Sequence, residues 1–236
     1  MDQKIKAQRF TDDEVAAVYR AIELRRDMRH FSGGQVPPAV LARLLRAAHL
    51  GPSVGLTQPW HFVRITDLTL RQRLAAHVGE ERMATAEALS GRSDEFLRLK
   101  VEGIMEAAEV LLLLLRPDRH LHVFGRRTMP AMDLASATCA VQNMWLAARA
   151  EGIGLGWVSL FKPDEVARTI NAPPNADPVA ILCLGPVDAF YDEPMLQKER
   201  WERRAPLQEI LSENAWAARS PLSSWLSALD ATNPAD

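Results

Sequence analysis

The sequence lacks the residue clusters that mark metal-binding and disulfide-bonded proteins. Its 236 residues contain two cysteines, Cys139 and Cys183, which stand far apart in apolar surroundings, and the six histidines include no His-x-x-x-His pair. Isolated apolar cysteines are typical of buried free thiols in a reducing compartment, and a structural zinc site needs closely spaced ligands. We therefore expect free thiols and no metal. The Gly-x-Ser-x-Gly elbow of many serine hydrolases is also missing.

An excess of charge of one sign is missing as well. Lys and Arg number 28 and Asp and Glu 30, so the formal net charge is -2, whereas a nucleic-acid-binding protein needs a strongly basic face.

The longest apolar run, residues 110–115, is far shorter than the roughly 20 residues that cross a bilayer, and the N-terminus lacks the apolar core of a secretory signal. We expect a cytoplasmic protein that contacts neither nucleic acid nor membrane, and partners that are small molecules or a second copy.

The sequence does contain enough apolar material for one sizeable core. Hydrophobic residues make up 47% of the chain, and no repeat or linker divides it, so we interpret residues 1–236 as a single domain. The two ends, 1–10 and 217–236, are expected to be loosely ordered tails.

Helical and strand patterns alternate along the chain and predict an α+β fold. Thr11 and Glu14 form the pattern of a capping box, which starts a helix that runs into a cluster of arginines. A second long pattern, residues 132–151, is apolar round most of its circumference and predicts a central or interface helix. Three short stretches predict strands: the alternating residues 61–65, and the apolar residues 110–115 and 178–185, which predict core strands.

The arginine cluster reads Glu-Leu-Arg-Arg-Asp-Met-Arg-His-Phe at residues 23–31. If the first helix persists to Arg29, then Arg25 and Arg29 share one face, and their planar guanidinium groups could together bind one phosphate, each through two hydrogen bonds. Asp27 would then point to nearly the opposite side of the helix. If the helix ends near Arg26, Asp27 instead lies beside the ligand. An exposed salt-bridge patch, worth under about 1 kcal/mol, explains the cluster equally well.

Four further segments are candidates for a ligand site. Residues 51–60 are rich in Gly and Pro, which permit close backbone approach to a ligand but also suit an ordinary connection. The alternating glycines of 152–159 follow a helix and enter a strand, the wrong order for a dinucleotide fingerprint, so we expect backbone amides there to face a planar ligand. A charged helix is expected at 93–106, where Leu99 and Lys100 could border a pocket. A late arginine doublet includes Arg204 and is usually a surface charge pair.

Together these motifs resemble the FMN-dependent nitroreductase superfamily. Residues 25–31 are similar to its Arg-Arg-Ser-x-Arg-x-Phe opening, and residues 52–60 to its Pro-Ser-x-x-Asn-x-Gln-Pro-Trp loop, although the Asn is missing here. The likeness is greatest to the branch that makes 5,6-dimethylbenzimidazole, the lower ligand of cobalamin, because this chain has Arg-Arg-Asp in place of Arg-Arg-Ser. The resemblance implies a nitroreductase-like fold with a central, mainly antiparallel sheet flanked by helices, and an intertwined homodimer.

The resemblance also implies a set of flavin-binding residues: Arg25, Arg26, Asp27, Met28, Arg29, Ser53, Leu99, Lys100, Gly156, Trp157, Val158, Ser159 and Arg204. The arginines would bind the phosphate and the polar flavin edge, and the loop at Ser53 would approach the flavin across the dimer. Asp27 and Ser159 would be catalytic. A general acid/base at Asp27 suits the proton transfers of ring fragmentation, and the nearby arginines should favour its ionised form. No role follows for His30 or for residues 127–133.

The activity implied is the oxygen-dependent fragmentation of reduced FMN to 5,6-dimethylbenzimidazole and erythrose 4-phosphate. Reduced FMN would be the substrate, molecular oxygen the oxidant, and a separate flavin reductase the supplier. Two alternatives stay open, an NAD(P)H-dependent nitroreductase or flavin reductase that keeps its FMN, and a flavin-binding or storage module.

Overall fold

The structure is a computed structural model that describes residues 9–121 and 124–216. Within these residues the chain forms two compact units, the first ending at Met195 and the second beginning at Leu196. Most of both predicted tails, 1–8 and 217–236, lies outside the described residues. None of the described helices is long and apolar enough to cross a membrane.

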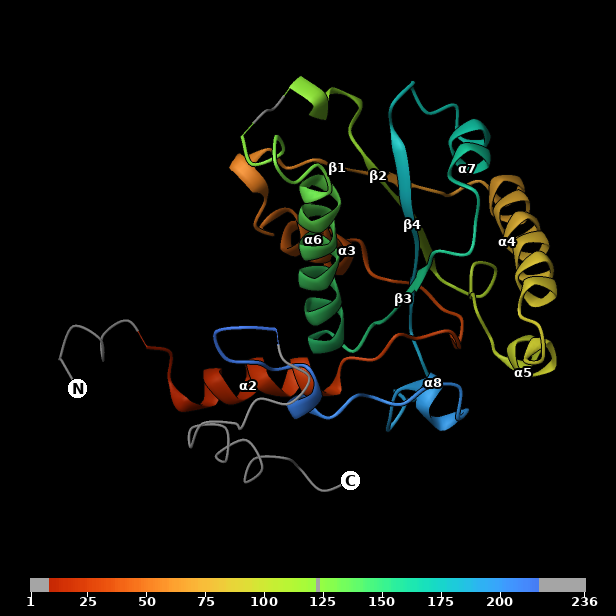
Figure 1. The fold of residues 1–236 in the computed structure, drawn as a ribbon. Helices are drawn as coiled ribbons and strands as arrows, with labels where there is room; N and C mark the ends of the chain where they lie inside the picture. Colours follow the sequence, from red (N-terminus) through yellow and green to blue (C-terminus); the bar gives the residue numbers. More distant parts are fainter. Residues whose placement is uncertain (1–8, 122–123, 217–236) are drawn as a thin grey trace. The chain divides into compact units, whose positions relative to one another are not determined.

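A four-stranded antiparallel sheet forms the centre of the first unit (Figure 1). Its strands stand in the order β1-β2-β4-β3, and every neighbouring pair is antiparallel. The three predicted strands are present, and the glycine-rich segment supplies the edge strand. The bounds are β1 Trp60–Arg64, β2 Glu109–Leu115, β3 Gly154–Val158 and β4 Asp177–Gly185.

The helices have clear local start signals. The capping box is formed as predicted, because the Glu14 amide donates to the Thr11 hydroxyl and the Thr11 amide donates to the Glu14 carboxylate. The helices of the first unit are α2 Asp12–Leu24, α3 Pro38–His49, α4 Leu68–Ala88, α5 Ser93–Arg98, α6 Met132–Ala150 and α7 Pro163–Thr169. Shorter helical segments are η1 Val54–Leu56, η2 Pro117–Leu121, α8 Met195–Lys198 and η3 Leu207–Glu209.

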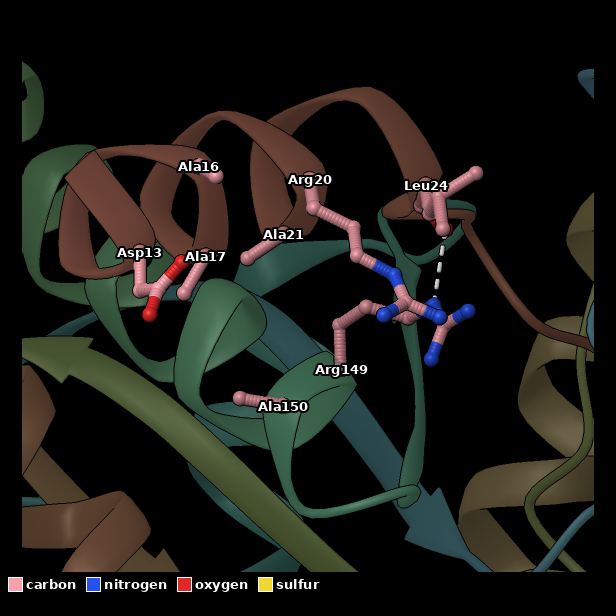
Figure 2. Close-up of a pocket in the computed structure, with 8 residues that line it drawn as sticks. All are labelled: Asp13, Ala16, Ala17, Arg20, Ala21, Leu24, Arg149 and Ala150. Carbon is pink, nitrogen blue, oxygen red and sulfur yellow. Dashed lines mark hydrogen bonds between the residues drawn. The ribbon is translucent and has the colours of Figure 1, made fainter.

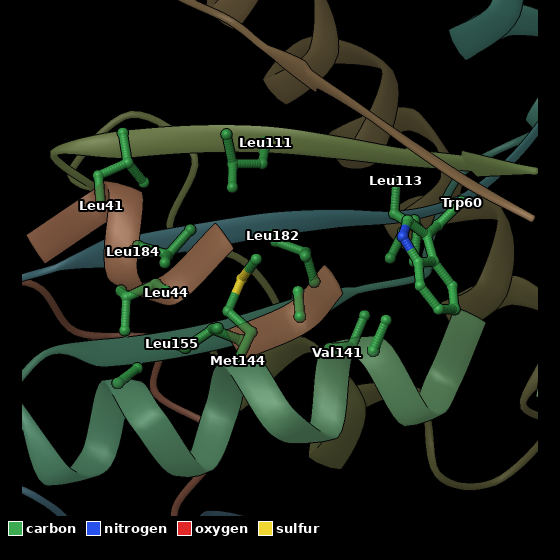
Figure 3. Packing of buried hydrophobic residues seen from close by; sticks show 14 of the residues in the cluster. Leu41, Leu44, Trp60, Leu111, Leu113, Val141, Met144, Leu155, Leu182 and Leu184 are labelled. Atoms are coloured by element: carbon green, nitrogen blue, oxygen red, sulfur yellow. The ribbon is translucent and has the colours of Figure 1, made fainter. Parts of the chain in front are cut away.

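The sheet is buried on both faces. Every residue of β2 is buried, including Glu109 at its start, and its apolar run 110–115 is typical of a strand that is covered on both sides. On one face, Leu111 and Leu113 pack with α3 and α6 in a cluster that includes Met144 (Figure 3). On the other face, Leu112 and Leu114 pack in a second cluster with residues of α4 and α7. Each fully buried leucine contributes about 1.5–3 kcal/mol, so β2 is the centre of the core.

Two expectations from the sequence need correction. The charged helix expected at 93–106 ends at Arg98, and Leu99 is its extended C-cap. In the connection that follows, Gly103 lies against the main-chain oxygen of Arg29, where a Cβ would approach to 2.8 Å. Cys183 is buried as expected, whereas Cys139 is only half-buried.

Helix α2 is amphipathic, yet none of its residues is buried. Val18, Tyr19 and Ile22 are 47%, 67% and 48% exposed. These three side chains are therefore left largely exposed by the described part of the chain, whereas Leu24 is half-buried.

Candidate functional site

The arginine motif is not helical beyond Leu24. Arg25 is the C-cap of α2 with extended backbone angles (φ -64°, ψ 132°), so the arrangement of Arg25 and Arg29 on one helical face does not occur. The chain instead runs beside β3, where Asp27 forms a parallel bridge with Leu155 and the Met28 amide donates to the Leu155 oxygen at 3.0 Å. Asp27 thus lies where the chain has left the helix.

The glycines of β3 are explained by this close approach. A Cβ on Gly156 would lie 2.1 Å from the Met28 main-chain oxygen and 2.5 Å from Arg29 Nη1. A Cβ on Gly154 would lie 2.5 Å from a Val187 side-chain carbon. Glycine is therefore needed here so that the motif can pack on the strand, a reason distinct from the planar ligand expected from the sequence.

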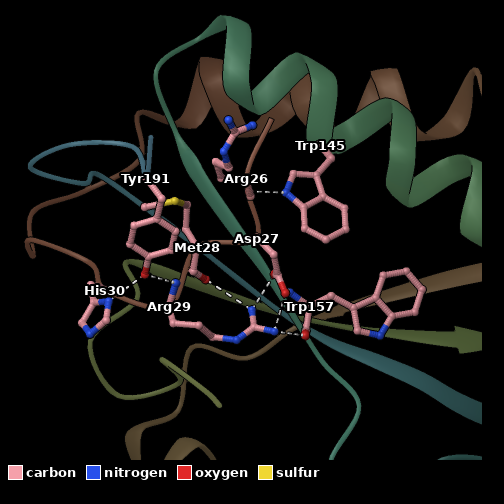
Figure 4. Close-up of polar contacts among 8 residues, drawn as sticks. All are labelled: Arg26, Asp27, Met28, Arg29, His30, Trp145, Trp157 and Tyr191. Carbon is pink, nitrogen blue, oxygen red and sulfur yellow. Dashed lines mark hydrogen bonds and ion pairs between the residues drawn. The ribbon is translucent and has the colours of Figure 1, made fainter. Parts of the chain in front are cut away.

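Asp27, Arg29 and the main chain of Trp157 form a closed hydrogen-bonded ring (Figure 4). Arg29 Nη1 and Nη2 donate to the two Asp27 oxygens, each at 2.6 Å. The Trp157 amide donates to Asp27 Oδ1 at 2.9 Å, and Arg29 Nη2 donates to the Trp157 oxygen at 2.5 Å. The ring fixes the carboxylate against the end of β3, and bidentate pairs of this kind are among the strongest polar contacts in proteins.

The environment of Asp27 alters its acidity. Although 42% of the side-chain surface is exposed, the surrounding protein removes water from the carboxyl group, and this desolvation raises its pKa. Arg29, the Trp157 amide and Arg25 act in the opposite direction without reversing the shift. The arginines thus favour the ionised form, as expected, but desolvation outweighs them and leaves the pKa raised. A raised pKa suits a group that both accepts and donates a proton.

The three arginines have different surroundings. Arg29 is 8% exposed, and the donors of its two terminal nitrogens are taken by Asp27, the Trp157 oxygen and, at 3.3 Å, the Met28 oxygen. Arg26 donates to three main-chain oxygens, those of Glu23, Arg25 and Asp192. Arg25 places its guanidinium 4.7 Å from the Trp145 ring centre and has no hydrogen-bond acceptor among the described residues. Of the three, Arg25 is the one with donors available for an anion.

Two aromatic residues that the sequence reasoning did not assign hold this segment in place. Trp145 Nε1 donates to the Arg26 oxygen at 3.0 Å, from within α6. The Tyr191 hydroxyl accepts from the Arg29 amide at 3.2 Å and lies 2.6 Å from His30 Nδ1. Trp145 was part of an apolar helical pattern, and nothing in the sequence placed Tyr191 beside the motif.

The other predicted residues near β3 differ in access. Met28 has no exposed surface and Val158 is 1% exposed, so a ligand could reach only their main chain without rearrangement. Ser159 is exposed at the end of β3. In the Gly-Pro loop, the Ser53 hydroxyl accepts from the Gln58 amide at 3.0 Å and thereby closes the loop on itself.

Leu99 and Lys100 take no part in the ring, and Arg204 lies outside the first unit. Leu99 is 5% exposed, and Lys100 Nζ pairs with Glu106 Oε1 at 2.6 Å. Arg204 belongs to the second unit, where its amide donates to Gln197 Oε1 at 3.4 Å. Flavin contacts of these three residues stay predictions.

Two hollows of the first unit lie away from the predicted flavin residues. One, of about 500 Å³, lies between α2 and α6 and is lined by small side chains together with Arg20 and Arg149 (Figure 2). Arg149 closes its end by donating to the Leu24 oxygen at 2.9 Å. The other, of about 540 Å³, is lined by residues of β1, β2 and the segment after α7. Neither hollow is lined by a residue of the predicted flavin set.

The donors near the motif fit a flavin phosphate. FMN carries a dianionic phosphate, which planar guanidinium groups bind well. Arg25 is half-buried, stacked on an indole and free of hydrogen-bond acceptors among the described residues. When bound, FMN would supply the redox chemistry.

Comparisons with known proteins agree with the sheet and the motif. The nitroreductase family model matches residues 22–186. A 5,6-dimethylbenzimidazole synthase of Rhodobacter capsulatus is 36% identical over 194 residues, covering 81% of this chain and 94% of the relative. A protein of the same name from Rhodospirillum rubrum is 38% identical over 185 residues, covering 77% and 87%.

Solved structures show the same fold. A BluB-like flavoprotein of Clostridium difficile 630 superposes with a TM-score of 0.63 at 20% identity, covering 83% of this chain and 97% of that one. An iodotyrosine deiodinase bound to FMN and 3-iodo-L-tyrosine gives a TM-score of 0.67 at 22% identity, covering 84% and 100%. With the family model spanning most of its length, the chain belongs to the nitroreductase family.

Proposed function

We propose that this protein is a 5,6-dimethylbenzimidazole synthase, which uses molecular oxygen to fragment reduced FMN into 5,6-dimethylbenzimidazole and erythrose 4-phosphate. The observation that carries the proposal is Asp27, a partly exposed carboxylate held by Arg29 and Trp157 inside a nitroreductase-like arginine motif. Relatives that bear this name are 36% and 38% identical over most of the chain, which supports the same activity here.

In this proposal the residues around the motif have separate roles in binding and catalysis. Arg25, which has donors available, binds the phosphate of FMN, with Arg26 and Arg204 as further cationic groups. Asp27 accepts and returns protons as carbon and nitrogen bonds of the ring system are broken and formed. Ser159, exposed at the end of β3, donates a hydrogen bond from its hydroxyl to the flavin ring.

A second copy of the chain completes the site in this proposal. The uncovered apolar residues of α2 support a homodimer, since a helix with no buried residue gains little from folding alone. The loop at Ser53 then reaches the flavin of the other subunit. A separate flavin reductase supplies reduced FMN, and the cytoplasm remains the expected location.

The test is an aerobic product assay. Purified protein is mixed with chemically reduced FMN and air, and 5,6-dimethylbenzimidazole is measured by mass spectrometry against a protein-free control. Product above the control is expected, and its absence would sink the proposal. The Asp27→Ser variant is expected to keep FMN binding but lose product, whereas equal product from this variant would remove the acid/base role.

The same assay separates two other functions. A nitroreductase that keeps its FMN, the activity named for an Archaeoglobus fulgidus relative at 24% identity, would oxidise NAD(P)H steadily with a nitroaromatic acceptor. The loop Asn of ordinary nitroreductases is missing here, which argues against that activity. A storage module would protect reduced FMN from air without fragmenting it.

A further inference from the structure

Arg29 is placed to act on Asp27 and not directly on a phosphate. Its guanidinium is 8% exposed, and both terminal nitrogens already donate, to the two Asp27 oxygens and to the main-chain oxygens of Met28 and Trp157. A phosphate could recruit these donors only by breaking the Asp27 pair. Arg25, by contrast, has no acceptor among the described residues.

The ring leaves the two Asp27 oxygens in different states. Oδ1 accepts from Arg29 Nη1 at 2.6 Å and from the Trp157 amide at 2.9 Å, so both of its in-plane lone pairs are used. Among the described residues, Oδ2 accepts only from Arg29 Nη2, at 2.6 Å, so one lone pair remains available. Because 42% of the side chain is exposed, a substrate can approach the available position.

We propose that Arg29 is the positioning residue of this site and that it directs proton transfer to Asp27 Oδ2. This is the oxygen that does not accept from the Trp157 amide. This inference rests on the proposed function. The oxygen takes a proton from a carbon or nitrogen of the substrate to become a carboxylic acid, and it returns the proton to the leaving group. Arg29 itself transfers no proton.

Lysine cannot replace arginine in this arrangement. The ring needs a planar group that donates to two carboxylate oxygens and to the Trp157 oxygen at once, whereas an ammonium keeps the charge without the fork geometry. Arg29→Lys therefore leaves the cationic charge near the flavin and removes the orientation of Asp27. The Arg29→Lys variant therefore distinguishes a role of Arg29 in orienting Asp27 from a role that depends only on its positive charge.

The experiment is a double-mutant cycle in the single-turnover product assay, with Arg29→Lys, Asp27→Asn and the double variant. Loss of a general acid/base group costs about 10²–10⁴ in rate, so Asp27→Asn should fall in that range. Arg29→Lys alone should fall at least about 10-fold, yet in the Asp27→Asn background it should change the rate by less than about 2-fold, because the residue acts only through Asp27. Equal losses in both backgrounds would overturn the proposal.

A matched control uses another bidentate pair of the first unit. Arg64 donates to both oxygens of buried Glu109 at 2.7 Å, between β1 and β2, and neither residue belongs to the predicted flavin set. Arg64→Lys should leave the product rate within about 2-fold of the unaltered protein once folding is verified. FMN affinity, measured by titration for each variant, should be unchanged by Arg29→Lys in the Asp27→Asn background, and a large loss there would show a direct phosphate contact.

A second readout does not depend on activity. Arg29 lowers the pKa of Asp27 both by its charge and by its hydrogen bonds. Lys keeps the charge but not the two hydrogen bonds, so Arg29→Lys should move the carbon-13 carboxyl titration of Asp27 to higher pH, with the resonance identified by its loss in Asp27→Asn. An unchanged titration would overturn the positioning role. If the unaltered protein makes no dimethylbenzimidazole, the proposed function fails, and this titration still decides whether Arg29 controls Asp27.

Discussion

The contact between β3 and the arginine motif predicts that Gly156→Ala is strongly destabilising. The added Cβ would lie 2.1 Å from the Met28 main-chain oxygen and 2.5 Å from Arg29 Nη1. The first of these is a backbone atom, which cannot rotate away as the end of a flexible side chain can. The strand and the motif must therefore move apart.

The magnitude follows from what that movement breaks. The Met28 amide would lose the Leu155 oxygen, now at 3.0 Å, and the Trp157 amide would lose Asp27, now at 2.9 Å. Overpacking costs about 1–3 kcal/mol and each of the two lost hydrogen bonds about 1 kcal/mol, so we expect about 3–5 kcal/mol lower stability. For a domain of this size, this lowers Tm by about 6–20 °C.

Urea unfolding followed by circular dichroism measures the effect, and Gly79→Ala is the matched control. Gly79 lies within α4, and a Cβ there would meet nothing within 4 Å. Alanine is a better helix former by about 1 kcal/mol, so this variant should gain about 0.5–1 kcal/mol. If Gly156→Ala unfolds at the same urea concentration as the unaltered protein, the close approach of the motif to β3 is refuted.

Three other predictions concern single side chains. Arg64→Met leaves Glu109, which is 6% exposed, without its bidentate partner and should lower the free energy of unfolding by about 1–3 kcal/mol, measured by urea titration; no loss would contradict the pairing. Because burial raises the pKa of Asp27, the native chain binds the proton of this carboxyl group more tightly than the unfolded chain does. The contribution of Asp27 to stability therefore falls as the pH rises from its pKa in the unfolded chain, about 3.9, through its higher pKa in the folded chain. The unfolding free energy of the unaltered protein relative to Asp27→Asn should therefore decrease across that window, and an increase would show a lowered pKa. Burial also raises the pKa of Cys183 to about 12, so iodoacetamide at pH 8 should modify this thiol only after unfolding, as peptide mass spectrometry can test.

Local signals in the sequence predicted the elements that depend on neighbouring residues. The Thr11–Glu14 capping box starts α2, and the apolar run of β2 forms a strand buried on both faces, as expected. The long apolar pattern became α6, whose described bounds differ from the prediction by one residue at its end. These outcomes follow from capping chemistry and hydrophobic periodicity, which act over a few residues.

The site depended on contacts that the sequence cannot supply. Helix α2 ends at Leu24 because the following residues pair with β3, which lies about 130 positions later in the chain, as the Trp157–Asp27 hydrogen bond shows. The sequence therefore identified Asp27 and the arginines as a group without revealing that Arg29 binds Asp27. It also left the role of Trp145 hidden, since an indole in an apolar helix pattern gives no sign of its Arg26 partner.

The central claim is that Asp27 serves the fragmentation of reduced FMN. The most direct measurement is the yield of 5,6-dimethylbenzimidazole per reduced FMN in air, for the unaltered protein and for Asp27→Asn at equal FMN occupancy. We predict product from the unaltered protein and a rate lower by about 10²–10⁴ for the variant. Product formed at the same rate by both proteins would contradict the account.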